Sequence, residues 1–114
     1  MFDECTDPDL IDAILRTEPL VDIVRVGWED APPERIKDPE LLIAAEETAR
    51  VLVSNDKKSL PGHLANHFAS GRHTHGVILM RRGFSIGTLA EELLIVWTAS
   101  EAEEWIDGWL YIPY

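Results

Sequence analysis

Short apolar runs between polar segments constrain the fold of this 114-residue chain more than any other feature. Residues 51–53 (Val-Leu-Val) and 77–80 (Val-Ile-Leu-Met) are continuous runs, which are typical of parallel strands buried on both faces. Residues 109–112 (Trp-Leu-Tyr-Ile) predict a last strand, and residues 21–26 (Val-Asp-Ile-Val-Arg-Val) predict an earlier one. Met1-Phe2 adds the stump of a first strand. We therefore expect a mostly parallel sheet of four to five strands.

Helical patterns fill the segments between these runs. Each pattern has a start signal, and the signals are Asp7-Pro8, Asp38-Pro39, Ser59 ahead of Leu60-Pro61, and Ser85. The pattern after Ser85 is the longest and is expected to end before Gly108. Regular alternation of strands and helices predicts a three-layer α/β fold, with helices on both faces of the sheet. At this length we expect one domain over residues 1–114.

The net charge of −11 argues against a general nucleic-acid binder, because phosphate contacts need Lys and Arg. The charge is uneven, however. Residues 50–82 hold six of the ten basic residues, one of the 21 acids and all four histidines. A phosphate-binding surface and ordinary charged helix faces explain this basic segment equally well.

Cys5 is the only cysteine, so the chain forms no internal disulfide. No apolar run approaches the ~18 residues of a membrane span, and the acidic start of the chain differs from the basic start of a signal peptide. We therefore expect a soluble cytoplasmic protein without a membrane partner.

Acidic side chains follow two of the expected strands. Asp3 and Glu4 follow the first, and Asp56 follows the run at residues 51–53. In parallel α/β folds, sites lie beyond the carboxyl ends of the strands. Glu40 and its neighbour Asp38, at a helix start, add further carboxylates, although acids in a first turn are also favoured by the helix dipole alone. Carboxylates grouped at this edge would suit Mg²⁺ or Mn²⁺.

Four segments resemble a PIN-like family of toxin-like proteins related to VapC-type ribonucleases. They are Met1-Phe-Asp-Glu-Cys5, Asp38-Pro-Glu-Leu-Leu42, Arg50-Val-Leu-Val-Ser-Asn-Asp-Lys-Lys-Ser-Leu60 and His75-Gly-Val-Ile-Leu-Met-Arg81. The order and separation of these short motifs agree with the family over nearly the whole chain. The resemblance implies a PIN-like fold and Mg²⁺- or Mn²⁺-dependent ribonuclease activity. It also implies a small antitoxin-like protein partner.

By the same resemblance, Asp3, Glu40 and Asp56 match the positions of the metal-binding catalytic carboxylates, and Glu4 is a weaker candidate. The basic side chains Lys58, Arg81 and Arg82 would then contact the phosphates of an RNA substrate, although ion pairs with nearby acids explain them as well.

Two departures from the family favour a second interpretation. Lys58 stands where the family usually has a second Asp, and the first strand is shorter than in relatives. The alternative is a catalytically impaired PIN-like module that binds a protein or oligomerises. Trp105 and Trp109 lie among acids and would suit an interface with a second copy or an antitoxin-like partner.

The histidines allow a third, less favoured interpretation. His63 and His67 are four residues apart on one expected helix face, and His73 and His75 follow in a loop. Imidazole groups in this arrangement would suit Zn²⁺, Ni²⁺ or Cu²⁺. A polar helix face with a loop, and no metal, is the favoured explanation of these histidines.

Overall fold

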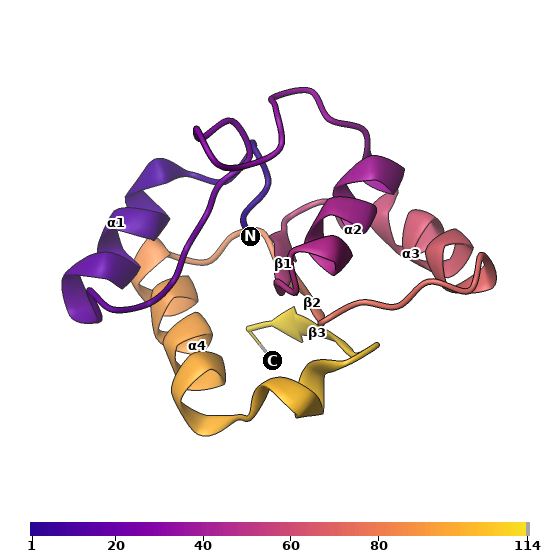
Figure 1. Cartoon of the computed structure of the whole chain (residues 1–114). Helices are drawn as coiled ribbons and strands as arrows, with labels where there is room; N and C mark the ends of the chain where they lie inside the picture. Colours follow the sequence, from indigo (N-terminus) through magenta and orange to yellow (C-terminus); the bar gives the residue numbers. More distant parts are fainter. Residues whose placement is uncertain (114) are drawn as a thin grey trace.

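The structure is a computed structural model, and it describes residues 1–113. A parallel sheet of three strands forms its centre, in the order β1-β2-β3. The strands are β1 (Leu52–Ser54), β2 (Val77–Met80) and β3 (Trp109–Ile112). All three apolar runs therefore form strands, as expected (Figure 1).

The expectation of four to five strands is wrong. Residues 21–26 and the chain start contribute only two isolated parallel bridges, from Phe2 to Arg25 and from Phe2 to Val53. The Phe2 segment is too short to extend either ladder, because Asp3 already leads into a turn toward the first helix. The segments nevertheless lie in the order Arg25, Phe2, β1, β2, β3.

Four α-helices connect these segments: α1 (Pro8–Thr17), α2 (Asp38–Glu47), α3 (Leu60–Ala69) and α4 (Ile86–Ala99). The Asp7 side chain caps α1 by accepting from the Asp9 N–H, and Ser85 caps α4. Two details differ from expectation. Lys37 is the N-cap of α2, so Asp38 is its first helical residue. The last helical pattern breaks at Ser100, after which a separate 3-10 helix η1 (Ala102–Trp105) forms.

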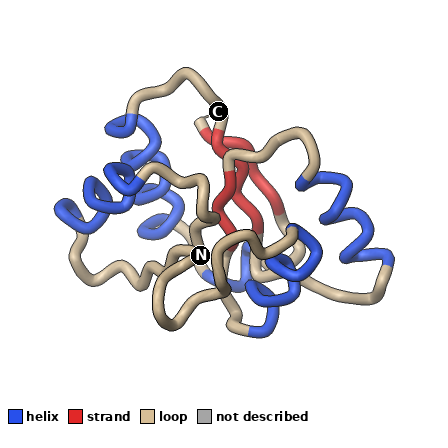
Figure 2. Tube along the Cα trace, turned by 90° about the horizontal axis from the view of Figure 1, so that it is seen from above, coloured by secondary structure: helices blue, strands red, loops and turns tan. Residues whose placement is uncertain are grey.

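Two helices cover each face of the sheet (Figure 2). Side chains alternate along the strands, so Leu79 packs with Leu42 of α2 and Leu64 of α3 on one face. Ile78 packs with Ile14 of α1 and Leu93 of α4 on the other. The described chain is thus a three-layer α/β fold. No helix within residues 1–113 is long and apolar enough to cross a membrane.

The strand order creates a topological switch point. From Phe2 the chain runs through α1 to Arg25 on one side, and from there through α2 to β1 on the other side of Phe2. Connections that diverge in this way leave a crevice at the carboxyl ends of two adjacent strands, where α/β proteins keep their ligand sites. Here that edge is formed by Asp3 and by Ser54–Asp56.

Candidate functional site

Asp3 is held at the switch point by two hydroxyl groups. The Ser54 hydroxyl donates to Asp3 Oδ2 over 2.5 Å, and the Thr6 hydroxyl donates to Oδ1 over 3.0 Å. Ser54 and Thr6 are themselves buried, at 3 % and 2 % exposure. The orientation of the Asp3 carboxylate is therefore set by rigid neighbours.

Asp56 organises the turn between β1 and α3. Its N–H donates to the Ser54 hydroxyl over 3.1 Å, which links it to the Asp3 anchor. Its Oδ1 accepts from the N–H groups of Lys58 and Ser59, both at 3.1 Å, and its Oδ2 accepts from the Ser59 hydroxyl. Side-chain to backbone bonds of this kind are why Asp and Ser favour turns ahead of helices.

Asp38, the first residue of α2, also lies close to the Ser59 hydroxyl that contacts Asp56. Its Oδ2 lies 3.5 Å from the Ser59 hydroxyl oxygen, so Asp38 and Asp56 flank one hydroxyl group. His63 of α3 is the nearest cationic candidate, with Nε2 3.9 Å from Asp38 Oδ2.

The pKa values of Asp38 and Asp56 are shifted in opposite directions. Burial raises the pKa of Asp38, the negative charges of Asp56 and Asp3 raise it further, and His63 and Ser59 oppose the rise. The Ser59 hydroxyl lowers the pKa of Asp56 most, followed by the Ser59 N–H. Opposed shifts in neighbouring carboxyls are typical of pairs that share a proton or a cation. Burial and the charges of Asp3 and Glu4 also raise the pKa of the Cys5 thiol, which agrees with an unreactive cysteine.

The other expected site residues, Glu40, Lys58, Arg81 and Arg82, have exposed side chains. Glu40 is exposed on α2, and within residues 1–113 its side chain makes no hydrogen bond or ion pair. The Lys58 side chain is also exposed. Arg81 and Arg82 follow β2 at the same sheet edge. Arg81 Nε donates to the Pro113 carbonyl over 2.9 Å, and its guanidinium lies 5.2 Å from the Tyr111 ring centroid.

Sequence reasoning missed the serines that connect the acids. Ser54 ties Asp3 to Asp56, and Ser59 ties Asp56 to Asp38. A signal for the second link is present in the sequence, because Asp56 precedes Ser59 by three residues ahead of a helix, a common turn pattern. In the first link, the bond between Ser54 and Asp56 is local, whereas the bond between Ser54 and Asp3 spans 51 positions and carries no local signal.

Three of the four histidine side chains contact different acidic partners, and one of them is His63, which contacts Asp38. His67 is buried, and its Nε2 lies 2.9 Å from the His73 carbonyl oxygen and 3.2 Å from Glu46 Oε1. His73 Nδ1 instead lies 2.7 Å from Asp107 Oδ2. Within the described residues no three side chains of His, Cys, Asp or Glu form a group that could hold a metal ion as they stand. This finding applies to the histidines and equally to the predicted carboxylate set Asp3, Glu40 and Asp56.

Comparisons of the chain with protein-family models, with curated proteins and with solved structures found no match.

Proposed function

We propose that this chain is a Mg²⁺- or Mn²⁺-dependent ribonuclease with a PIN-like fold, of the toxin type that pairs with a small antitoxin-like protein. The observation that carries the proposal is the Asp38–Asp56 pair, which flanks the Ser59 hydroxyl at the switch point and has opposed pKa shifts. The motif resemblance over four segments of the chain agrees with it.

The donor set fits a cation bound mainly through water. Mg²⁺ commonly uses one or two carboxylates and keeps several of its waters. Asp38 and Asp56 would be these two ligands. Burial and then the charge of Asp56 raise the pKa of Asp38, and a divalent cation would relieve the repulsion between the two carboxylates. Asp3 is linked to Asp56 through the Ser54 hydroxyl. Glu40 of α2 remains a predicted further ligand.

When bound, the cation would activate water and neutralise charge on a phosphodiester. The chain's own residues then have separate tasks. Ser59 and the N–H groups ahead of α3 hold Asp56 in position. The exposed cations Lys58, Arg81 and Arg82 follow β1 and β2 in the sequence and would contact the RNA backbone.

One observation favours the alternative of a catalytically impaired, partner-binding or oligomerising module. All four carboxylate oxygens of Asp3 and Asp56 already accept hydrogen bonds from the protein. Exposed apolar side chains on α4 and β3 would then form the contact surface, with Ile95 58 %, Trp97 48 % and Trp109 51 % exposed.

Incubation of the protein with a single-stranded RNA and Mn²⁺ or Mg²⁺ distinguishes the ribonuclease from the partner-binding module. We expect cleavage that is lost in Asp56→Asn and retained in Asp12→Asn, a matched change at an exposed acid on α1. Retained cleavage in Asp56→Asn would contradict the proposed site, and no cleavage by the wild type with a tight protein complex would favour the alternative.

A further inference from the structure

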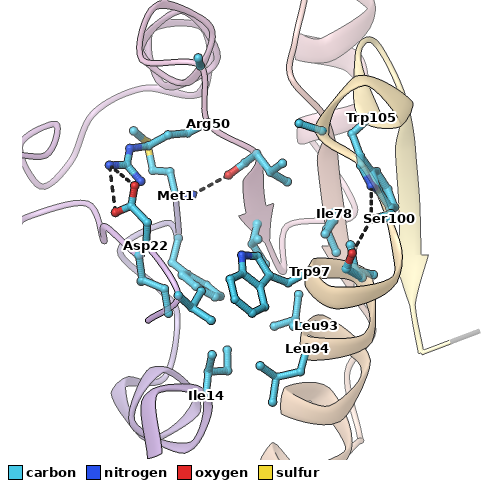
Figure 3. Close-up of a pocket in the computed structure, with 18 of the residues that line it drawn as sticks. Met1, Ile14, Asp22, Arg50, Ile78, Leu93, Leu94, Trp97, Ser100 and Trp105 are labelled. Carbon is cyan, nitrogen blue, oxygen red and sulfur yellow. Dashed lines mark hydrogen bonds and ion pairs between the residues drawn. The ribbon is translucent and has the colours of Figure 1, made fainter. Parts of the chain in front are cut away.

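A cavity of about 440 Å³ opens at the amino edge of the sheet, opposite the acidic site. It lies between α1 and α4, and the residues just before β1 and β3 complete its wall (Figure 3). Pockets of roughly 300–1,000 Å³ are of the size that holds small molecules.

The cavity wall is mainly apolar. Ile14 of α1, Ile78 of β2 and Leu93 and Leu94 of α4 line it, and the Trp97 ring is directed toward it from α4 (Figure 3). Trp105 lies on the far side, fixed by the hydrogen bond from its Nε1 to the Ser100 hydroxyl over 2.8 Å. These walls favour an aliphatic or aromatic body over a polar one.

A single guanidinium group stands at the mouth. Arg50 contacts both carboxylate oxygens of Asp22, at 3.2 and 3.3 Å, through Nη2 alone. Within residues 1–113, its Nε and Nη1 donate to no other group. The Asp22 carboxylate is 80 % exposed and Arg50 is 24 % exposed, so this surface pair is weak and open to exchange.

We propose that this cavity binds a small carboxylate with an apolar body, such as a medium-chain fatty acid. The carboxylate would pair with the unused side of the Arg50 fork, which matches two carboxylate oxygens at once. The apolar body would lie against Trp97, Leu93 and Ile14. This site is separate from the acids at the carboxyl edge, and its ligand needs no divalent cation.

Titration calorimetry with octanoate and with octanol tests the proposal on the whole chain. Because one charge-assisted contact distinguishes the two ligands, we expect octanoate to bind roughly tenfold more tightly than octanol. In Arg50→Gln this preference should disappear while octanol binding persists. Ala102→Trp, a change at an exposed position of the cavity wall, should weaken both ligands.

Unchanged melting temperatures would show that both variants fold. Equal binding of octanoate and octanol to the wild type would overturn the proposal in favour of a neutral apolar ligand. Absence of octanoate binding, or an unaltered octanoate preference in Arg50→Gln, would also overturn it.

Discussion

The Ser54 hydroxyl donates a 2.5 Å hydrogen bond to Asp3, a residue 51 positions earlier in the chain. The same hydroxyl accepts from the Asp56 N–H, so one buried oxygen joins the two strand ends that form the switch point. Asp3 and Asp56 of the candidate site are therefore both tied to the last residue of β1.

Replacing this hydroxyl tests how firmly the two strand ends are joined. In Ser54→Ala, Asp3 loses a donor and the Asp56 N–H loses its acceptor, so we expect a loss of about 1–3 kcal/mol in unfolding free energy. Denaturant unfolding measures it. Ser70→Ala is the matched control, because in the described part of the chain that exposed hydroxyl hydrogen-bonds only to the Asn66 carbonyl. Equal effects of the two changes would contradict the anchoring role of Ser54.

The proton affinity of Asp56 depends on Ser59. Because the Ser59 hydroxyl is the main cause of the lowered pKa of Asp56, Ser59→Ala should raise that pKa toward the ordinary value. The Ser59 N–H remains in the variant, so the return should be partial. Carbon-detected NMR titration of the Asp56 carboxyl measures it, and an unchanged pKa would refute the assignment.

The His73–Asp107 pair predicts a pH dependence of stability. Asp107 raises the pKa of His73 above its ordinary value, so the folded state holds the proton more tightly than the unfolded chain. The stabilisation is fully present below pH ~6.5. It is lost as the pH rises through the raised pKa of the folded state. The difference in unfolding free energy between wild type and His73→Gln should shrink over this range, and a constant difference would count against the pair.

The Met1 amino group should change the stability with pH in the opposite direction, because its pKa is lowered rather than raised. Burial lowers its pKa to about 5, and it donates to the Val51 carbonyl over 2.5 Å. The unfolded chain therefore binds more protons between pH ~8 and ~5, so stability should fall as the pH falls through this window. Acetylation of the amino group removes its titration. Unfolding curves of both forms measure the difference, and parallel pH profiles would contradict the lowered pKa.

Core packing at β2 sets the largest expected loss of stability. Leu79 of β2 is fully buried, and its side chain packs on the face of the sheet that α2 and α3 cover. Leu79→Ala should therefore cost about 2–5 kcal/mol. Leu20, 84 % exposed, provides the control, and Leu20→Ala should change stability little. Similar losses in the two variants would contradict the described core.

The sequence predicted the central strands well because their apolar runs reflect burial on both faces. Residues 77–80 and 109–112 form strands with the expected bounds. Residues 21–26 also have β-branched character, yet they form one bridge, because among residues 1–113 their strand partner is the stump at Phe2 alone. Strand formation there depends on a neighbour, which local composition does not describe.

The site was predictable only in part for a similar reason. The sequence indicated acids after two of the expected strands, and the Phe2–Val53 bridge shows that the segments ahead of Asp3 and Asp56 are neighbours. The role of Ser54 arises from tertiary contact and left no pattern. Trp97 of α4 is 48 % exposed and lines the cavity at the amino edge, which no residue pattern indicated.

Mn²⁺ binding measured by calorimetry at neutral pH tests the central claim most directly. The proposed site predicts one ion per wild-type chain, with binding lost in Asp38→Asn and in Asp56→Asn and retained in Asp12→Asn. If the wild type binds no Mn²⁺, or if both site variants bind it as the wild type does, the Asp38–Asp56 pair is not a metal site.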